Sequence, residues 1–166
     1  MNRHILEKLQ IVGGFTPINM ASGANTGDYV SLKNYGRCAI VLFKGAGFAG
    51  EDPIITLSQA TDVSGSGVKS LTTARYDHKS GTLAALGQFT TVAQTAAGTV
   101  SAASSAAVES IVVIDIKAED LDIDGGFDCL KASVADVGTT SQIGGLLYLL
   151  HEPRIGSSPL PSAIAD

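Results

Sequence analysis

Short runs of β-branched and apolar residues, with no long helical stripe between them, most limit the folds open to this chain. The runs 37–43 and 146–150 are apolar on both faces. The run 110–117 is rich in β-branched residues, and its second half alternates, so that Asp115 and Lys117 share one face. Runs of this length, separated by glycine-rich connections, predict β-strands.

Further strands are expected at 54–59, 88–92 and 127–134, the last with Leu130, Ala132 and Val134 on one face. The runs 37–43 and 54–59 could form a hairpin. A single helical turn is expected at 118–121 and turn-rich loops at 15–28 and 61–70. The small-residue stretch 96–107 reads as a loop or weak strand, because it has no amphipathic stripe.

Six or more short strands without a long helix predict an all-β fold, either an antiparallel β-sandwich or a jelly-roll-like barrel with at most short helices. Strands that are apolar on both faces occupy central positions or bury their outer face against another subunit. The composition is compatible with a packed core, since 45% of the residues are apolar. Gly, Ala, Ser and Thr nevertheless make up 69 of the 166 residues.

One β-rich domain is predicted over residues 15–152, with an arm at each end. The N-terminal residues 1–14 are expected to form an arm or a short helix that stops at Gly13-Gly14, because the apolar residues there recur at helical spacing: Ile5, Leu6, Leu9 and Val12. Residues 153–166 hold three of the five prolines and are expected to form an extended arm.

Charge and hydropathy exclude several partners. The net charge is −5, and residues 109–136 alone carry eight carboxylates and two lysines. No basic stripe exists, so we expect no binding to nucleic acid or to anionic membranes. The segment 143–150 is too short to span a bilayer, and the N-terminus lacks the apolar core of a signal peptide. The chain is therefore expected to be soluble and made in a cytoplasm.

Two glycine-rich segments resemble phosphate-binding loops but depart from them at decisive positions. Gly45–Gly50 fits GxGxxG, yet Glu51, Asp52 and Pro53 follow where a helix must begin, so a turn is predicted. Gly65–Ser70 lacks the glycine that must precede the lysine of a P-loop, since Val68 stands there. Neither segment predicts a cofactor, and none is assigned.

The acidic segment 120–128 has two readings. Five of its residues fit the ligand and glycine positions of an EF-hand calcium loop: Asp120, Asp122, Asp124, Gly125 and Asp128. The twelfth position should be a bidentate Glu but is Lys131, and the flanks read as strands. We interpret the segment as a solvated acidic turn, with a weak divalent-cation site as the alternative; no metal ligand is assigned.

No catalytic residue is assigned. His151-Glu152 begins like the zinc motif HExxH, but Pro153 and Ile155 end the match. The other histidines, His4 and His78, lie in unrelated contexts with no nucleophile beside them. The two cysteines, Cys38 and Cys129, lie in apolar runs and read as small buried hydrophobic residues; a disulfide between them is the alternative.

A series of segments resembles a family of small virion structural proteins encoded in tailed bacteriophages and prophages. The segments, in order, are Tyr29–Gly36, Gln59–Gly65, Leu121–Cys129, Ala132–Gly138, Leu147–Arg154 and Pro161–Ala165. The resemblance runs from about residue 5 to the end. No segment is a catalytic motif, so the resemblance carries over no functional residue.

The resemblance implies a β-rich decoration (cement) protein that binds the major capsid protein on the head exterior. It would be a homo-oligomer, a trimer or dimer, made in the cytoplasm of the bacterial host. Many shallow contacts suit small side chains, which lose little rotamer entropy on burial. The alternatives are a tail or head–tail connector component, which would form larger rings, or a surface module for host glycans. Glycan sites use exposed Trp or Tyr faces, and the chain disfavours one because it has no Trp and only four tyrosines: Tyr29, Tyr35, Tyr76 and Tyr148. An enzyme is not expected.

Overall fold

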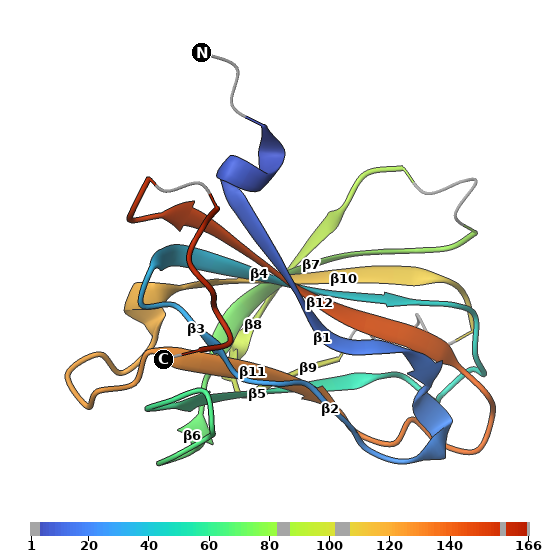
Figure 1. Ribbon diagram of the computed structural model, residues 1–166. Coiled ribbons are helices and arrows are strands. Elements are labelled where there is room, and N and C mark those ends of the chain that lie inside the picture. Colours follow the sequence, from blue (N-terminus) through green and yellow to red (C-terminus); the bar gives the residue numbers. More distant parts are fainter. Residues whose placement is uncertain (1–3, 83–86, 102–106, 157–158, 166) are drawn as a thin grey trace.

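The computed structural model describes residues 4–82, 87–101, 107–156 and 159–165, which form two antiparallel sheets packed face to face (Figure 1). Sheet A has the spatial order β1 (Leu9–Asn19), β12 (Ile143–Pro153), β4 (Tyr35–Lys44), β10 (Ser110–Lys117), β7 (Thr73–Ser80) and β8 (Thr90–Ala97). Sheet B has the order β2 (Asn25–Thr26), β11 (Cys129–Val134), β5 (Ile54–Ala60) and β6 (Lys69–Ser70), with β3 (Val30–Ser31) on β11 and β9 (Thr99–Ser101) on β5.

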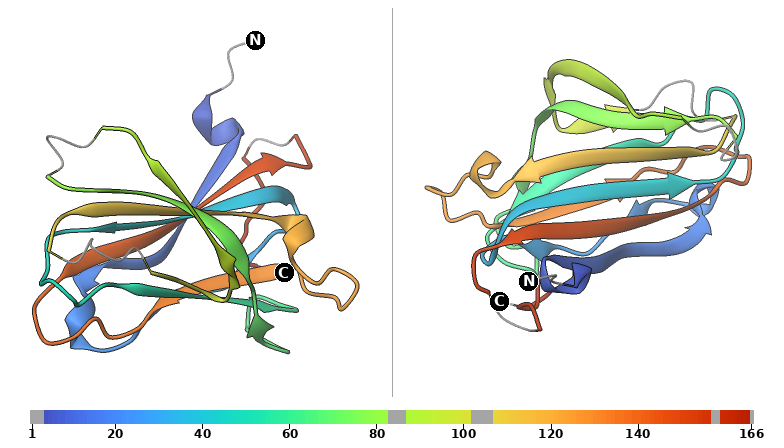
Figure 2. Two further views of the ribbon diagram at one scale, coloured as in Figure 1. Left: turned by 180° about the vertical axis from the view of Figure 1, so that it is seen from behind. Right: turned by 90° about the horizontal axis from the view of Figure 1, so that it is seen from above.

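This architecture confirms the predicted all-β sandwich. Helical structure in the described ranges consists of single 3-10 turns: η1 (Ile5–Glu7), η2 (Met20–Ser22) and η4 (Ala118–Asp120). The last of these confirms the helical turn expected at 118–121. Figure 2 shows the long strands of sheet A lying side by side across one face of the molecule.

The core lies between the sheets and follows the alternation of the strands. In β10 the odd and even positions separate cleanly, because Val112, Ile114 and Ile116 are buried whereas Asp115 and Lys117 are exposed. The expected inward face of β11 is also confirmed, since its three alternating apolar residues are fully buried. Each sheet thus contributes one apolar face to a single main cluster.

A tyrosine of sheet A completes the hydrogen bonding of sheet B. On one side of β11 the partner strand is interrupted between β2 and β3. There the Ala132 N–H donates to the Tyr148 hydroxyl oxygen (2.9 Å), while the Ala132 carbonyl accepts from the Gly27 N–H (3.1 Å). A Cβ at Gly27 would lie 2.6 Å from both the Ala132 carbonyl oxygen and the Tyr148 hydroxyl, so only glycine fits. Tyr148 is fully buried, and burial raises the pKa of its hydroxyl above the ordinary value.

The helix predicted near the N-terminus is largely wrong. Only residues 5–7 are helical, and Leu9–Asn19 form β1, which passes through Gly13-Gly14 and pairs with β12. A helix this short is marginal in water, and two central glycines weaken it further, whereas β12 offers a complete strand partner. The loop expected at 15–28 is accordingly part strand, and residues 1–3 lie outside the described residues.

The hairpin between 37–43 and 54–59 is also wrong, although both strands exist. β4 belongs to sheet A and β5 to sheet B, so residues 45–53 cross from one sheet to the other. This connection is longer than the usual hairpin loop of two to five residues. β4 instead pairs with β10 and β12, and β5 with β11, all of which come much later in the chain.

The middle of the chain differs from the prediction in detail. The weak strand expected at 88–92 is β8, which begins at Thr90 and extends to Ala97. The sequence analysis does not predict the neighbouring strand β7. Most of its residues are polar or charged and only Tyr76 is buried, so it has no apolar alternation. The stretch 96–107 contains the end of β8 and then β9, and its residues 102–106 lie outside the described residues.

The C-terminal segment, expected to be an extended arm, lies against its own domain. The Tyr35 hydroxyl donates to the Pro161 carbonyl, and the Ser31 N–H donates to the Ala163 carbonyl (2.7 Å). Leu160 and Ala163 are buried in the main core. β12 extends to Pro153, so the tail begins where this strand of sheet A ends. Through the bond from Ser31, the tail contacts β3.

We predict that Tyr148→Phe lowers the free energy of unfolding by about 1–3 kcal/mol, because it leaves the Ala132 N–H buried without an acceptor. Equilibrium urea denaturation measures the loss. Tyr29→Phe is the matched control: its hydroxyl contacts the Ser58 hydroxyl at 3.3 Å in a partly buried position, so water replaces that contact and the loss is smaller. Equal losses in both variants would contradict the role given to Tyr148.

Candidate functional site

The outer face of sheet A, away from sheet B, is apolar over its central strands. Cross-strand partners share a face of an antiparallel sheet, and the register places apolar side chains opposite one another there. We call this surface the outer apolar face, formed by Ile11, Val41, Phe43, Ile111, Val113, Ile143, Leu147 and Leu149. Four of them are well exposed: Ile11 (48%), Phe43 (50%), Ile143 (51%) and Leu147 (45%). An exposed apolar surface this continuous marks an interaction site.

One end of this face is hollowed into a groove of about 440 Å³. We call it the apolar groove; its apolar lining includes Phe15, Pro17, Val41, Phe43, Ile143, Gly145 and Leu147. Gly145 forms part of the hollow because it has no side chain, and a Cβ there would lie 3.2–3.4 Å from atoms of Pro17. Glu109 supplies a carboxylate to the lining. Lys44 also lines the groove, so the lining is mainly apolar with one charged residue of each sign.

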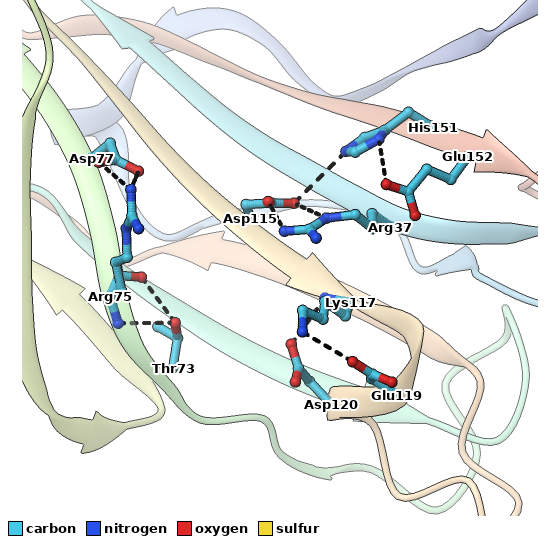
Figure 3. Close-up of polar contacts among 10 residues, drawn as sticks. All are labelled: Arg37, Thr73, Arg75, Asp77, Asp115, Lys117, Glu119, Asp120, His151 and Glu152. Atoms are coloured by element: carbon cyan, nitrogen blue, oxygen red, sulfur yellow. Dashed lines mark hydrogen bonds and ion pairs between the residues drawn. The ribbon is translucent and has the colours of Figure 1, made fainter.

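The opposite end of the same face is charged (Figure 3). Arg37 of β4 forms a two-point ion pair with Asp115 of β10, and His151 of β12 lies beside it, with Nε2 3.7 Å from an Asp115 carboxylate oxygen. Lys117 Nζ donates to Glu119 (3.0 Å), and the Lys117 N–H donates to Asp120 (2.9 Å). Both signs of charge are present and largely satisfy one another.

The pKa shifts in this charged end follow from those pairs. The hydrogen bond to the Asp115 carboxylate raises the pKa of the Arg37 guanidinium, so this residue stays charged. The Glu119 carboxylate raises the pKa of Lys117, and Lys117 lowers that of Glu119. These are partly or well exposed pairs of modest energy, suited to orienting a partner rather than to proton transfer.

A buried lysine closes the end of the sandwich beside the groove. Lys44 is 1% exposed, and its Nζ donates to the carbonyls of Val108 (2.7 Å) and Gly45 (3.2 Å). Desolvation lowers the pKa of Lys44 to about 8, against the carboxylates of Asp52 and Glu109, which raise it. The sequence analysis missed this residue, although strand alternation places it on the inward face with Leu42.

The glycine-rich segments lie in turns, as predicted. The segment 45–50 belongs to the connection between the sheets and is followed by β5, not by a helix. Glu51 fixes this connection, because its carboxylate accepts from the N–H groups of Thr139 (3.0 Å) and Thr140 (3.1 Å), which lower its pKa. Residues 65–68 lie in a turn in which Ser66 N–H donates to the Asp62 carboxylate (3.0 Å), and Lys69–Ser70 form β6.

The acidic segment 120–128 is a surface turn that supplies its own partners. Asp122 pairs with Lys69 and accepts from the Gly125 N–H (3.1 Å), so this carboxylate is already engaged. In the part of the chain that the structure describes, no cluster of three or more His, Cys, Asp or Glu side chains could hold a metal ion.

The histidines and cysteines are dispersed. His4 is the N-cap of η1, His78 is on β7 and His151 is on β12. Cys38 and Cys129 are buried thiols, as the reading of small hydrophobic residues predicts, and no disulfide joins them. Cys38 belongs to the main core, whereas Cys129 packs with Tyr29 and Ala60 in a small second cluster.

Comparison with protein-family profiles, with curated proteins and with solved structures finds no match for this chain. Within the described ranges, no helix has the length and apolar character needed to cross a membrane. The site is therefore argued from the geometry of sheet A alone: an apolar face with a groove at one end and paired charges at the other.

Lys44 predicts a pH dependence of stability. Between pH 8 and 10.5 the folded chain has lost the Lys44 proton while the unfolded chain retains it, so the free energy of unfolding rises with pH across this window. Burial raises the pKa of Cys38, which acts in the opposite direction above about pH 9. Both wild type and Lys44→Met contain Cys38, so its contribution cancels in the difference between their free energies of unfolding.

Urea denaturation at a series of pH values measures that difference. We expect wild type to gain stability relative to Lys44→Met from pH 8 to 10.5, and no further gain above that range. A difference that stays constant with pH would show that Lys44 titrates at its ordinary value.

Proposed function

We propose that this chain is a virion structural protein that binds the exterior of a phage capsid and stabilises the shell, as a decoration (cement) protein. The observation that carries the proposal is the outer apolar face of sheet A. Together with the resemblance of the sequence to small virion structural proteins, it favours a chain whose work is contact with other protein. The partner proposed is the major capsid protein, and the location is the outside of the head.

The outer apolar face supports this role through its rigidity. Its residues lie on β1, β12, β4 and β10, which are joined by continuous antiparallel ladders. A surface built on strands keeps its shape on binding, so little conformational entropy is lost. Burial of apolar area there contributes about 25 cal/mol per Å² before the costs of association.

The charged end supports orientation of the bound protein. Paired charges such as Arg37 and Asp115 at the margin of an apolar surface add little affinity but disfavour wrong registers. An apolar centre with a polar margin is the usual anatomy of a protein interface. A protein that binds only the assembled shell stabilises that shell by mass action.

Sedimentation with capsids tests the proposal. Purified protein is mixed with heads of the encoding virus that lack this protein, and bound protein is measured in the pellet, together with the temperature at which the heads open. We expect wild type to co-sediment and to raise that temperature. Failure to co-sediment, with no gain in heat resistance, would overturn the proposed function.

The surface is tested by placing one charge on it. Val113→Lys lies on β10, at the margin of the outer apolar face next to β7, opposite Asp77, which accommodates the lysine in the free protein. We expect at least a tenfold loss of affinity for heads. Val68→Lys is the matched control, because Val68 is 54% exposed in a turn away from this face, and it should bind as wild type does. Equal binding by both variants would place the contact elsewhere.

A further inference from the structure

The chain turns back on itself at Glu152, near the end of β12. Glu152 has a φ of 56°, in the left-handed region, and among the described non-glycine residues it alone has a positive φ. The next residue is Pro153, and a proline ring favours an extended backbone for the residue before it. The sequence thus favours an extended Glu152, whereas the fold holds it in a strained turn. We call residues 153–165, which follow this turn, the C-terminal arm.

Beyond this turn the C-terminal arm docks on its own domain. In Figure 1 it returns from the end of β12 toward β3. Near its start the Arg154 N–H donates to the Asn34 carbonyl (2.9 Å), and near its end the Ala163 carbonyl accepts from the Ser31 N–H. Two apolar side chains of the arm also belong to the main core. These contacts define a specific site for the arm, which we call the arm seat and which is centred on residues 31–35.

We propose that the C-terminal arm exchanges between copies, so that with Glu152 extended the arm of one copy occupies the arm seat of a second copy. The seat fits this occupant because it already holds the identical segment within one chain, and the same hydrogen bonds and apolar contacts form after exchange. The backbone at Glu152 is what changes. In the exchanged form it adopts the extended conformation that Pro153 favours, which releases the strain. Strain in a hinge of this kind favours domain swapping.

Exchange gives a closed assembly of identical chains. Each chain donates one arm and accepts one, so two copies exchange reciprocally or a few copies form a ring, and no arm seat is left empty. The residues of the seat are not among those that form the outer apolar face, so the exchange does not depend on the proposed function. Where the chain does bind a shell, copies linked by their arms bind it with avidity.

Refolding from urea over a range of chain concentrations, followed by light scattering, tests the exchange without any capsid. We expect the mass to rise from that of the 16.9 kDa chain to a multiple of it. Glu152→Gly should need an about fivefold higher concentration to assemble, because glycine adopts a positive φ without strain and so stabilises the closed monomer. Glu152→Gln is the matched control: it removes the same charge but keeps the strain, so it should assemble as wild type does. A monomer at every concentration, or the same behaviour in both variants, would overturn the proposal.

Isotope labelling shows which chain fills each arm seat. Chains labelled with ¹³C at their alanine methyl groups are mixed with deuterated, ¹⁵N-labelled chains, and the mixture is unfolded and refolded at a concentration that gives assembly. We expect a nuclear Overhauser effect (NOE) between the Ala163 methyl of one chain and the Ser31 amide proton of the other, because these residues share a hydrogen bond. The Ala132 methyl and the Gly27 amide share an equivalent bond outside the arm and should give no NOE between chains. An assembly in which the Ala163–Ser31 NOE appears only in chains that carry both labels would place each arm on its own domain and overturn the proposal.

Discussion

The two sheets meet through a hydroxyl that substitutes for a missing strand. Between β2 and β3 the edge of β11 has no strand partner, and the buried Ala132 N–H would be left unsatisfied without the Tyr148 oxygen. Because Tyr148 belongs to β12, this contact fixes the position of sheet A relative to sheet B. Gly27 makes the contact possible by leaving room for it.

With one face of sheet A committed to the core, its apolar outer residues are left without a covering layer. A sandwich of two sheets has no third layer to bury them, so Phe43, Ile143 and Leu147 remain in water in the isolated chain. The groove and the charged end divide this surface into parts of different chemistry. A protein partner bound on this face would cover it.

The sequence predicts those features that depend on near neighbours. Alternation within 110–117 and 127–134 identifies β10, β11 and their buried faces, because strand periodicity is local. Pairing between distant segments is not visible in this way, which is why the 37–43 and 54–59 runs were wrongly joined. The groove could not be predicted, since it needs Phe15 and Pro17 from a segment that was interpreted as a loop. Lys44 could have been found from alternation alone.

The place of β12 in sheet A has a consequence for synthesis on the ribosome. β12 lies between β1 and β4 in sheet A, although β1 and β4 are the first two long strands to be synthesised and β12 is the last strand in the described order. Until β12 is synthesised, β1 and β4 lack the ladders that they form with it. Completion of sheet A therefore waits for a strand that is made long after β1 and β4, and pairing between such distant segments is slow.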